Sequence, residues 1–122
     1  MMNKEYAIYL PKGVGKPEII EFKKEEGLDF YYKTIDCELI DIVNTVIEDY
    51  CLVVDDEGLM KPEPEINLRA SLLYGYLEHH QPIVGNALIC KNKYTNQGTE
   101  TVGYSYKEAK DLLKLFGIET ED

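Results

Sequence analysis

The chain has 122 residues, of which 13 are basic and 23 acidic, so its formal net charge at pH 7 is −10. This length allows one hydrophobic core and leaves no room for a second domain. An acidic surface argues against nucleic-acid backbones and anionic membranes as partners. No apolar stretch approaches the length that spans a bilayer, and no secretion signal is seen. We therefore expect a protein that stays in the cytoplasm.

The first half of the chain has the pattern of antiparallel strands. Residues 5–10 alternate and are rich in Tyr and Ile, and residues 18–23 repeat the pattern after a Gly- and Pro-rich turn, which predicts a β-hairpin. The turn contains glycines and lysines, as a phosphate-binding loop does, but it lacks the spacing of a Walker motif and no helix follows it directly. We therefore interpret it as the tip of the hairpin. The segments predicted next are a short helix over 28–34, a strand over 37–46, its hairpin partner over 50–54 and an acidic turn at 55–58.

The central stretch, residues 61–90, carries the most specific pattern. Its first two prolines exclude regular structure up to Asn67, which is placed to cap a helix from Leu68 to about Leu77. A further proline ends that helix before an apolar run at 83–90, which a Gly-Asn pair interrupts. A glycine inside a strand pattern indicates a bulge or a close approach to the backbone. The predicted core face of the helix carries Leu68, Leu72 and Leu73.

This stretch has two interpretations. In the first, Asn67 and Arg69 at the helix start form a small anion site with the Gly85-Asn86 pair, because helix N-termini bind anions. Arg69 is the only arginine in the chain, and arginine suits bidentate recognition of phosphate. In the second, Asn67 is only a cap, Arg69 only a surface charge and the Gly-Asn pair only a turn.

The last third of the chain is predicted to close the domain. A polar loop is expected over 92–101 and a short strand over 101–104. Ser105 and Glu108 have the spacing of a capping box, which predicts a helix over 106–116. Its core face would carry Ala109, Leu112, Leu113 and Phe116, and the four residues after Ile118 should be frayed. The fold class predicted for residues 1–122 is a single α+β domain, mainly an antiparallel β-sheet with peripheral helices.

Motifs of known chemistry are not found in the sequence. Cys37, Cys51 and Cys90 are widely spaced in apolar contexts and are interpreted as reduced core residues. No metal-ligand spacing, nucleophile elbow or dinucleotide fingerprint occurs, so no catalytic residue, metal or cofactor is expected. The ten tyrosines offer flat rings for a ligand or an interface. Tyr74, Tyr76, Tyr104 and Tyr106 flank the central stretch. Of these, Tyr76 and Tyr104 are the ligand-binding candidates, and ordinary packing is the alternative.

The segments Asn67-Leu-Arg-Ala-Ser-Leu-Leu-Tyr-Gly75 and Pro82-Ile-Val-Gly-Asn-Ala-Leu88 resemble the signature of a small domain family common in phages and prophages. The chain is similar to it throughout in length and element order, most closely to the first-described type of Thoeris anti-defence proteins. The resemblance implies a non-enzymatic sponge in the cytoplasm of the infected bacterial cell. It would bind the immune signal glycocyclic ADP-ribose intact, so that the host effector is not activated. It also implies a homodimer or higher homo-oligomer with ligand at subunit interfaces and, in some members, a separate site for cyclic trinucleotides.

At matching positions, the resemblance implicates Asn67, Arg69, Gly85 and Asn86 in ligand binding. Arginine and a helix N-terminus suit phosphates, a tyrosine suits the base, and Asn86 suits a ribose or base edge. Long-range repulsion by the net charge would oppose this ligand unless the pocket is locally basic. A rival from another class is an acidic DNA mimic that occupies a nucleic-acid-binding host protein, which requires carboxylates in a duplex-like row. A phosphodiesterase would need a metal cluster or general base, and neither is found.

Overall fold

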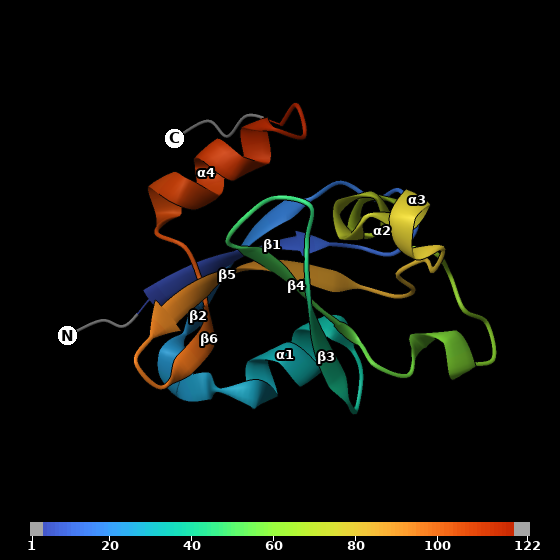
Figure 1. Cartoon of the computed structure of the whole chain (residues 1–122), viewed down its shortest axis with the longest axis horizontal. Coiled ribbons are helices and arrows are strands. Elements are labelled where there is room, and N and C mark those ends of the chain that lie inside the picture. The colour runs from blue at the N-terminus through green and yellow to red at the C-terminus, as the bar shows by residue number, and fades with distance from the viewer. Residues whose placement is uncertain (1–3, 119–122) are drawn as a thin grey trace.

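Six antiparallel strands form one twisted sheet in the computed structural model, which describes residues 4–118 of the chain (Figure 1). The strands lie in the order β2-β1-β5-β4-β3, and β6 pairs with β5 outside this path. Their bounds are β1 Lys4–Leu10, β2 Glu18–Lys23, β3 Ile40–Asn44, β4 Tyr50–Asp55, β5 Ala87–Thr95 and β6 Gly98–Val102. The predicted hairpins β1–β2 and β3–β4 are confirmed, although β3 is shorter than predicted.

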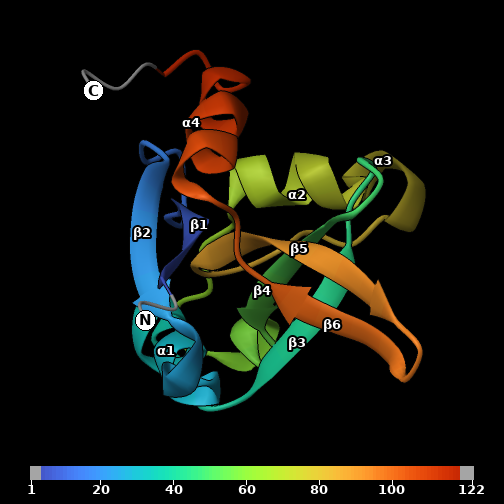
Figure 2. The same ribbon diagram turned by 90° about the vertical axis from the view of Figure 1, so that its left-hand side faces the viewer.

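Four α-helices accompany the sheet, so the predicted α+β class is confirmed. They are α1 Leu28–Ile35, α2 Leu68–Tyr74, α3 Tyr76–His79 and α4 Tyr106–Lys114, and two short 3-10 turns span Lys24–Glu26 and Gly58–Met60. α1 covers one face of the sheet, and α2 and α4 cover the other (Figures 1 and 2). The sheet is therefore the middle of three layers.

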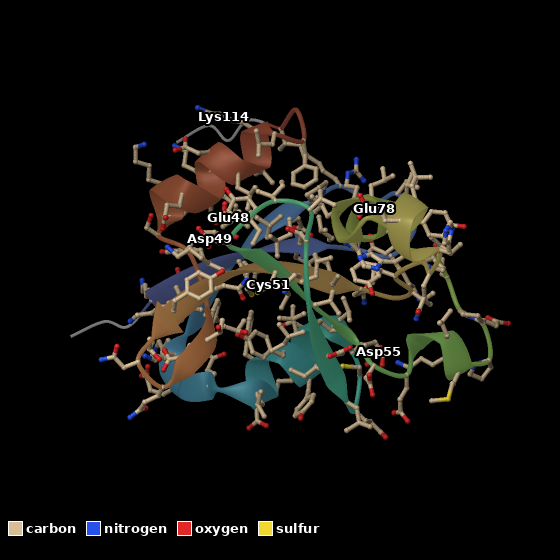
Figure 3. All side chains as sticks on the ribbon, viewed as in Figure 1. Glu48, Asp49, Cys51, Asp55, Glu78 and Lys114 are labelled. Carbon is tan, nitrogen blue, oxygen red and sulfur yellow. The ribbon has the colours of Figure 1, made fainter. Side chains whose placement is uncertain are left out.

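β5 is central because it pairs with β1, β4 and β6. Its first four residues, Ala87 to Cys90, are fully buried, since helices cover both faces of the sheet there. This explains why the sequence runs apolar at this point without alternation. Cys51 lies in the middle of the sheet (Figure 3). It pairs with Cys90 across β4 and β5, and both are buried free thiols, as predicted.

The helix predicted from Leu68 to Leu77 is divided in two. Gly75 adopts a left-handed conformation, with φ of 89°, which ends α2 and starts α3. The predicted core face is wrong for Leu68 and Leu72, which are exposed, whereas Leu73 is half-buried and packs against the core as predicted. The buried positions of the helix are Ala70 and Ser71. Small side chains face the sheet here, and they allow the helix to approach it closely.

The polar segment predicted as a loop over 92–101 is instead a β-hairpin. β5 continues to Thr95, turns through Asn96 and Gln97, and returns as β6. The Thr95 hydroxyl bonds the Gly98 carbonyl oxygen at 2.8 Å and holds the turn. Pairing between β5 and β6 outweighs the low strand propensity of this polar sequence. The capping box of α4 is confirmed, and the frayed residues predicted after Ile118 lie outside the described residues.

Candidate functional site

Asn67 is a fully buried structural brace. Its side-chain oxygen accepts a hydrogen bond from the Ala70 amide at 3.1 Å and so caps α2. Its side-chain nitrogen donates to the carbonyl oxygens of Leu10 and Gly85, both at 2.9 Å. The side chain thus joins the end of β1, the start of α2 and the segment before β5, and the predicted cap is confirmed.

The start of α2 is closed by the loop between β1 and β2, residues 11–17, here called the β1–β2 loop. The Leu68 amide donates to the Gly13 carbonyl at 3.2 Å, and the Gly13 amide donates to the Ile66 carbonyl at 2.8 Å. The Ala70 amide is bound by the Asn67 side chain. The amides of Leu68 and Ala70 at the start of α2 therefore already have partners within the protein, whereas the anion-site interpretation requires such amides to be free for a ligand.

Arg69 and Asn86 contact this loop from its two ends. Arg69 is half-buried and donates from Nη1 to the Gly15 carbonyl at 2.7 Å. Asn86, also half-buried, accepts from the Lys12 amide at 3.0 Å and donates to the Ile35 carbonyl at 3.3 Å. Within residues 4–118 the bond to Gly15 is the one hydrogen bond that the Arg69 guanidinium donates, so its other N–H groups can bind an anion.

The two tyrosine candidates lie apart from this cluster. Tyr104 is buried, donates its hydroxyl to the Cys90 carbonyl at 2.8 Å, and packs edge-on against Tyr50 at 5.7 Å between ring centroids. Burial raises the pKa of the Tyr104 phenol, which keeps it neutral. Tyr76 is exposed on α3, beyond the Gly75 break. The structure therefore gathers Asn67, Arg69, Gly85 and Asn86 around the β1–β2 loop, without Tyr104.

A groove of about 740 Å³ lies next to this loop and is lined by residues of the β1–β2 hairpin and α4. Figure 2 shows the ribbon of α4 beside β1 and β2. Lys16 comes from the loop, and Tyr6 and Tyr106 meet edge-to-face with ring centroids 5.2 Å apart. The remaining lining residues are Pro11, Pro17, Glu18, Ile19, Glu21, Leu113 and Ile118. Because Arg69 binds the carbonyl of Gly15, its guanidinium lies beside the loop that carries Lys16.

The charges of the groove are mixed. Lys16 supplies a cation, while Glu18 and Glu21 supply carboxylates from β2. The Tyr6 hydroxyl donates to Glu21 Oε1 at a long 3.4 Å. With apolar walls, two aromatic rings and both charge signs, the groove can bind a ligand that combines a flat ring, hydroxyl groups and an anion.

Sequence reasoning placed Tyr106 beside the central stretch but missed that it forms one site with Tyr6 and Lys16. Lys16 was placed at a hairpin tip, and the two tyrosines stand 100 positions apart on a strand and a helix. Only the packing of α4 over β1 and β2 brings them together. The two lysines of the β1–β2 loop, Lys12 and Lys16, were the one local signal.

Gly85 and Asn86 also line a smaller hollow of about 130 Å³, together with Lys12, Asp55 and Lys61. Asp55 lies at the end of β4 (Figure 3), and its nearly buried carboxylate binds Lys61 Nζ at 2.7 Å. This hydrogen bond raises the pKa of Lys61. The hollow is too small for a nucleotide, and its principal cation is already paired.

One family model matches most of the chain. Residues 3–117 match the model of a domain of unknown function, DUF3846. The chain belongs to the DUF3846 family. No curated protein and no solved structure matches this DUF3846 domain significantly.

Within residues 4–118, no group of three or more His, Cys, Asp or Glu side chains is arranged to hold a metal ion. In the same part of the chain, every helix is too short or too polar to cross a membrane.

Proposed function

We propose that this DUF3846 domain is a phage anti-defence protein that sequesters a cyclic ADP-ribose-type immune signal, such as glycocyclic ADP-ribose, without cleaving it. The observation that carries the proposal is the groove beside the β1–β2 loop, where Tyr6 and Tyr106 lie next to Lys16. Its volume of about 740 Å³ is in the range of small-molecule sites. The sequence resemblance to Thoeris anti-defence proteins supplies the ligand class.

The groups of the ligand match the groups of the groove. The phosphates would contact Lys16 and the free donors of Arg69, because charge-assisted bonds to phosphate are the strongest of this kind. The purine would pack on the Tyr6 and Tyr106 rings. The ribose hydroxyls would donate to the carboxylates of β2. Asn67, Gly85 and Asn86 would then act indirectly, by holding the β1–β2 loop in place.

Lys16 and Arg69 can attract an anionic ligand locally, although the net charge of the protein repels it. A molecule with a net charge of −10 repels anions at long range. Beyond about one Debye length, roughly 8 Å at physiological salt, carboxylates are largely screened, and within the groove Lys16 and Arg69 offset the charges of Glu18 and Glu21. Binding should therefore be slow at low salt and faster as added salt screens the repulsion.

We further propose that the domain acts as a homodimer or higher homo-oligomer. The support is a set of four exposed apolar side chains on α2 and α3, here called the apolar stripe: Leu68, Leu72, Tyr76 and Leu77. Leu68, Leu72 and Leu77 are 47%, 59% and 80% exposed. Residues 68–77 carry a single charge, that of Arg69, so two copies can approach here with little repulsion. Arg69 would then lie near the subunit interface.

Native mass spectrometry tests both proposals with a panel of cyclic ADP-ribose isomers and cyclic di- and trinucleotides. The expected result is a stable complex of an oligomer with a cyclic ADP-ribose isomer. Ligand released by heat after long incubation should be chemically unchanged. Binding of no panel member, with tight capture of a nucleic-acid-binding protein, would favour the DNA-mimic alternative. Release of linear ADP-ribose in more than stoichiometric amount would contradict sequestration.

A further inference from the structure

A second cavity, of about 420 Å³, lies on the opposite face of the sheet from the groove. Glu5 pairs with Phe22 across β1 and β2, and Phe22 packs with α1, whereas Tyr6 and Glu21 face α4. The cavity is lined by residues of β1, β2, α1, β3 and β6. Its lining residues are Glu5, Phe22, Lys24, Gly27, Leu28, Tyr31, Ile42, Thr99, Thr101 and Val102.

Glu5 is a fixed and unpaired carboxylate in this cavity. It is half-buried, and its Oε1 accepts a hydrogen bond from the Gly103 amide at 2.7 Å. A Cβ at Gly103 would lie 2.7 Å from Glu5 Cβ and 2.9 Å from Phe22 Cζ, so this segment packs tightly against both side chains. None of the ion pairs among the described residues includes Glu5. Its second oxygen remains free to accept.

The remaining walls are mainly aromatic and aliphatic. Phe22 and Tyr31 are buried, with ring centroids 6.4 Å apart, while Leu28 and Ile42 are exposed large side chains at the opening. A partly desolvated carboxylate gains most from a cationic partner, and aromatic rings also attract cations. Exposed aliphatic groups at the opening gain from covering an apolar ligand. Lys24, exposed on the lining, disfavours a ligand with a second positive charge.

We propose that this cavity binds a small organic monoammonium ion with an apolar body. The ammonium group donates to the free oxygen of Glu5, and the apolar body lies against Phe22, Leu28 and Ile42. The site is separate from the nucleotide groove, since the two cavities share no lining residue and lie on opposite faces of the sheet.

The test is a titration with phenethylamine, with the uncharged isostere phenethyl alcohol as the matched probe. Two-dimensional amide NMR spectra should show shifts at Gly27, Thr101 and Gly103 with the amine, and at least tenfold weaker binding of the alcohol. Equal binding of the two probes, or shifts scattered outside the cavity, would overturn the proposal. This comparison uses the wild-type chain and does not depend on any variant folding.

Two variants refine the test. Glu5→Gln keeps an oxygen for the Gly103 amide but removes the charge, and should weaken amine binding about ten- to a hundredfold. Lys24→Ala removes the like charge and should strengthen amine binding a few-fold. The control is Lys33→Ala, on the exposed side of α1, which should change nothing. Unchanged amine affinity in a folded Glu5→Gln variant would refute the role of Glu5. Nucleotide binding should be the same in all three variants, so failure of this proposal is distinct from failure of the proposed function.

Discussion

The side chain of Asn67 donates a 2.9 Å hydrogen bond to the carbonyl of Leu10, joining residues 57 positions apart in the sequence. The same amide group binds Gly85 and caps α2. One side chain therefore fixes β1, α2 and the start of β5 relative to one another. The β1–β2 loop, which carries Lys16 into the groove, begins immediately after this anchor.

Asn67→Ala should lower the free energy of unfolding by roughly 2–4 kcal/mol. The substitution leaves the carbonyls of Leu10 and Gly85 and the amide of Ala70 without their partner, and buried unpaired groups are costly. Urea denaturation followed by circular dichroism measures the change. Asn67→Asp is the matched variant, because it keeps the cap and the shape but removes both donors. A loss below about 0.5 kcal/mol in both variants would show that the brace is dispensable.

Lys16→Ala and Arg69→Ala should each weaken nucleotide binding by about ten- to a hundredfold. Each removes a charge-assisted contact to phosphate, which is worth about 1.5–3 kcal/mol. Calorimetric titration with one cyclic ADP-ribose isomer gives the dissociation constants. The control, Lys33→Ala, changes net charge equally on the opposite layer, and its affinity should stay within a factor of about two. If all three variants bind alike, the phosphates do not lie beside the β1–β2 loop.

The expectations for Lys16 and Asn86 differ most between sequence and structure. The sequence predicts that Lys16 lies at a hairpin tip and has no role in binding. It predicts that Asn86 is solvent-accessible and contacts the ligand. In the structure Lys16 lines the groove, whereas Asn86 bonds Lys12 and Ile35 and is half-buried. Asn86→Ala is therefore expected to lower stability as well as affinity. Local sequence cannot show which backbone groups a distant side chain reaches.

The elements that sequence predicted best are those with strong local signals. The capping box at Ser105 and the turn chemistry of the β1–β2 loop act within a few residues, so their pattern is sufficient. The orientation of α2 was not predictable in this way, because Leu68 and Leu72 have the spacing of a core face. Close contact of Ala70 and Ser71 with the sheet decided it instead. The spacing of apolar residues predicts that a helix has an apolar face, but tertiary packing decides whether that face contacts the core or another molecule.

Glu108 should make the stability of the domain depend on pH. Its carboxylate accepts from the Ser105 amide at 2.9 Å and pairs with Lys91 at 3.2 Å, and these contacts lower its pKa from 4.5. Because the folded-state pKa is below the unfolded value, the contribution is fully present above about pH 4.5 and is lost as pH falls through the lowered value. Urea midpoints measured from pH 3 to 7 for wild type and Glu108→Gln should converge at the acid end. If the urea midpoints of the two proteins differ by the same amount at every pH, the charge of Glu108 does not contribute to stability.

Leu72→Glu should convert the proposed oligomer into a monomer without unfolding it. Leu72 is 59% exposed and lies on the apolar stripe, so a carboxylate there costs the monomer little but places like charges together across an isologous interface. Sedimentation velocity at micromolar concentration, beside thermal unfolding, separates the two effects. The control is Tyr94→Glu on the β5–β6 hairpin, since Tyr94 is also exposed but lies away from α2 and α3. If Leu72→Glu also lowers nucleotide affinity, the ligand site needs both subunits. If it remains oligomeric while Tyr94→Glu dissociates, the interface lies on the β5–β6 hairpin.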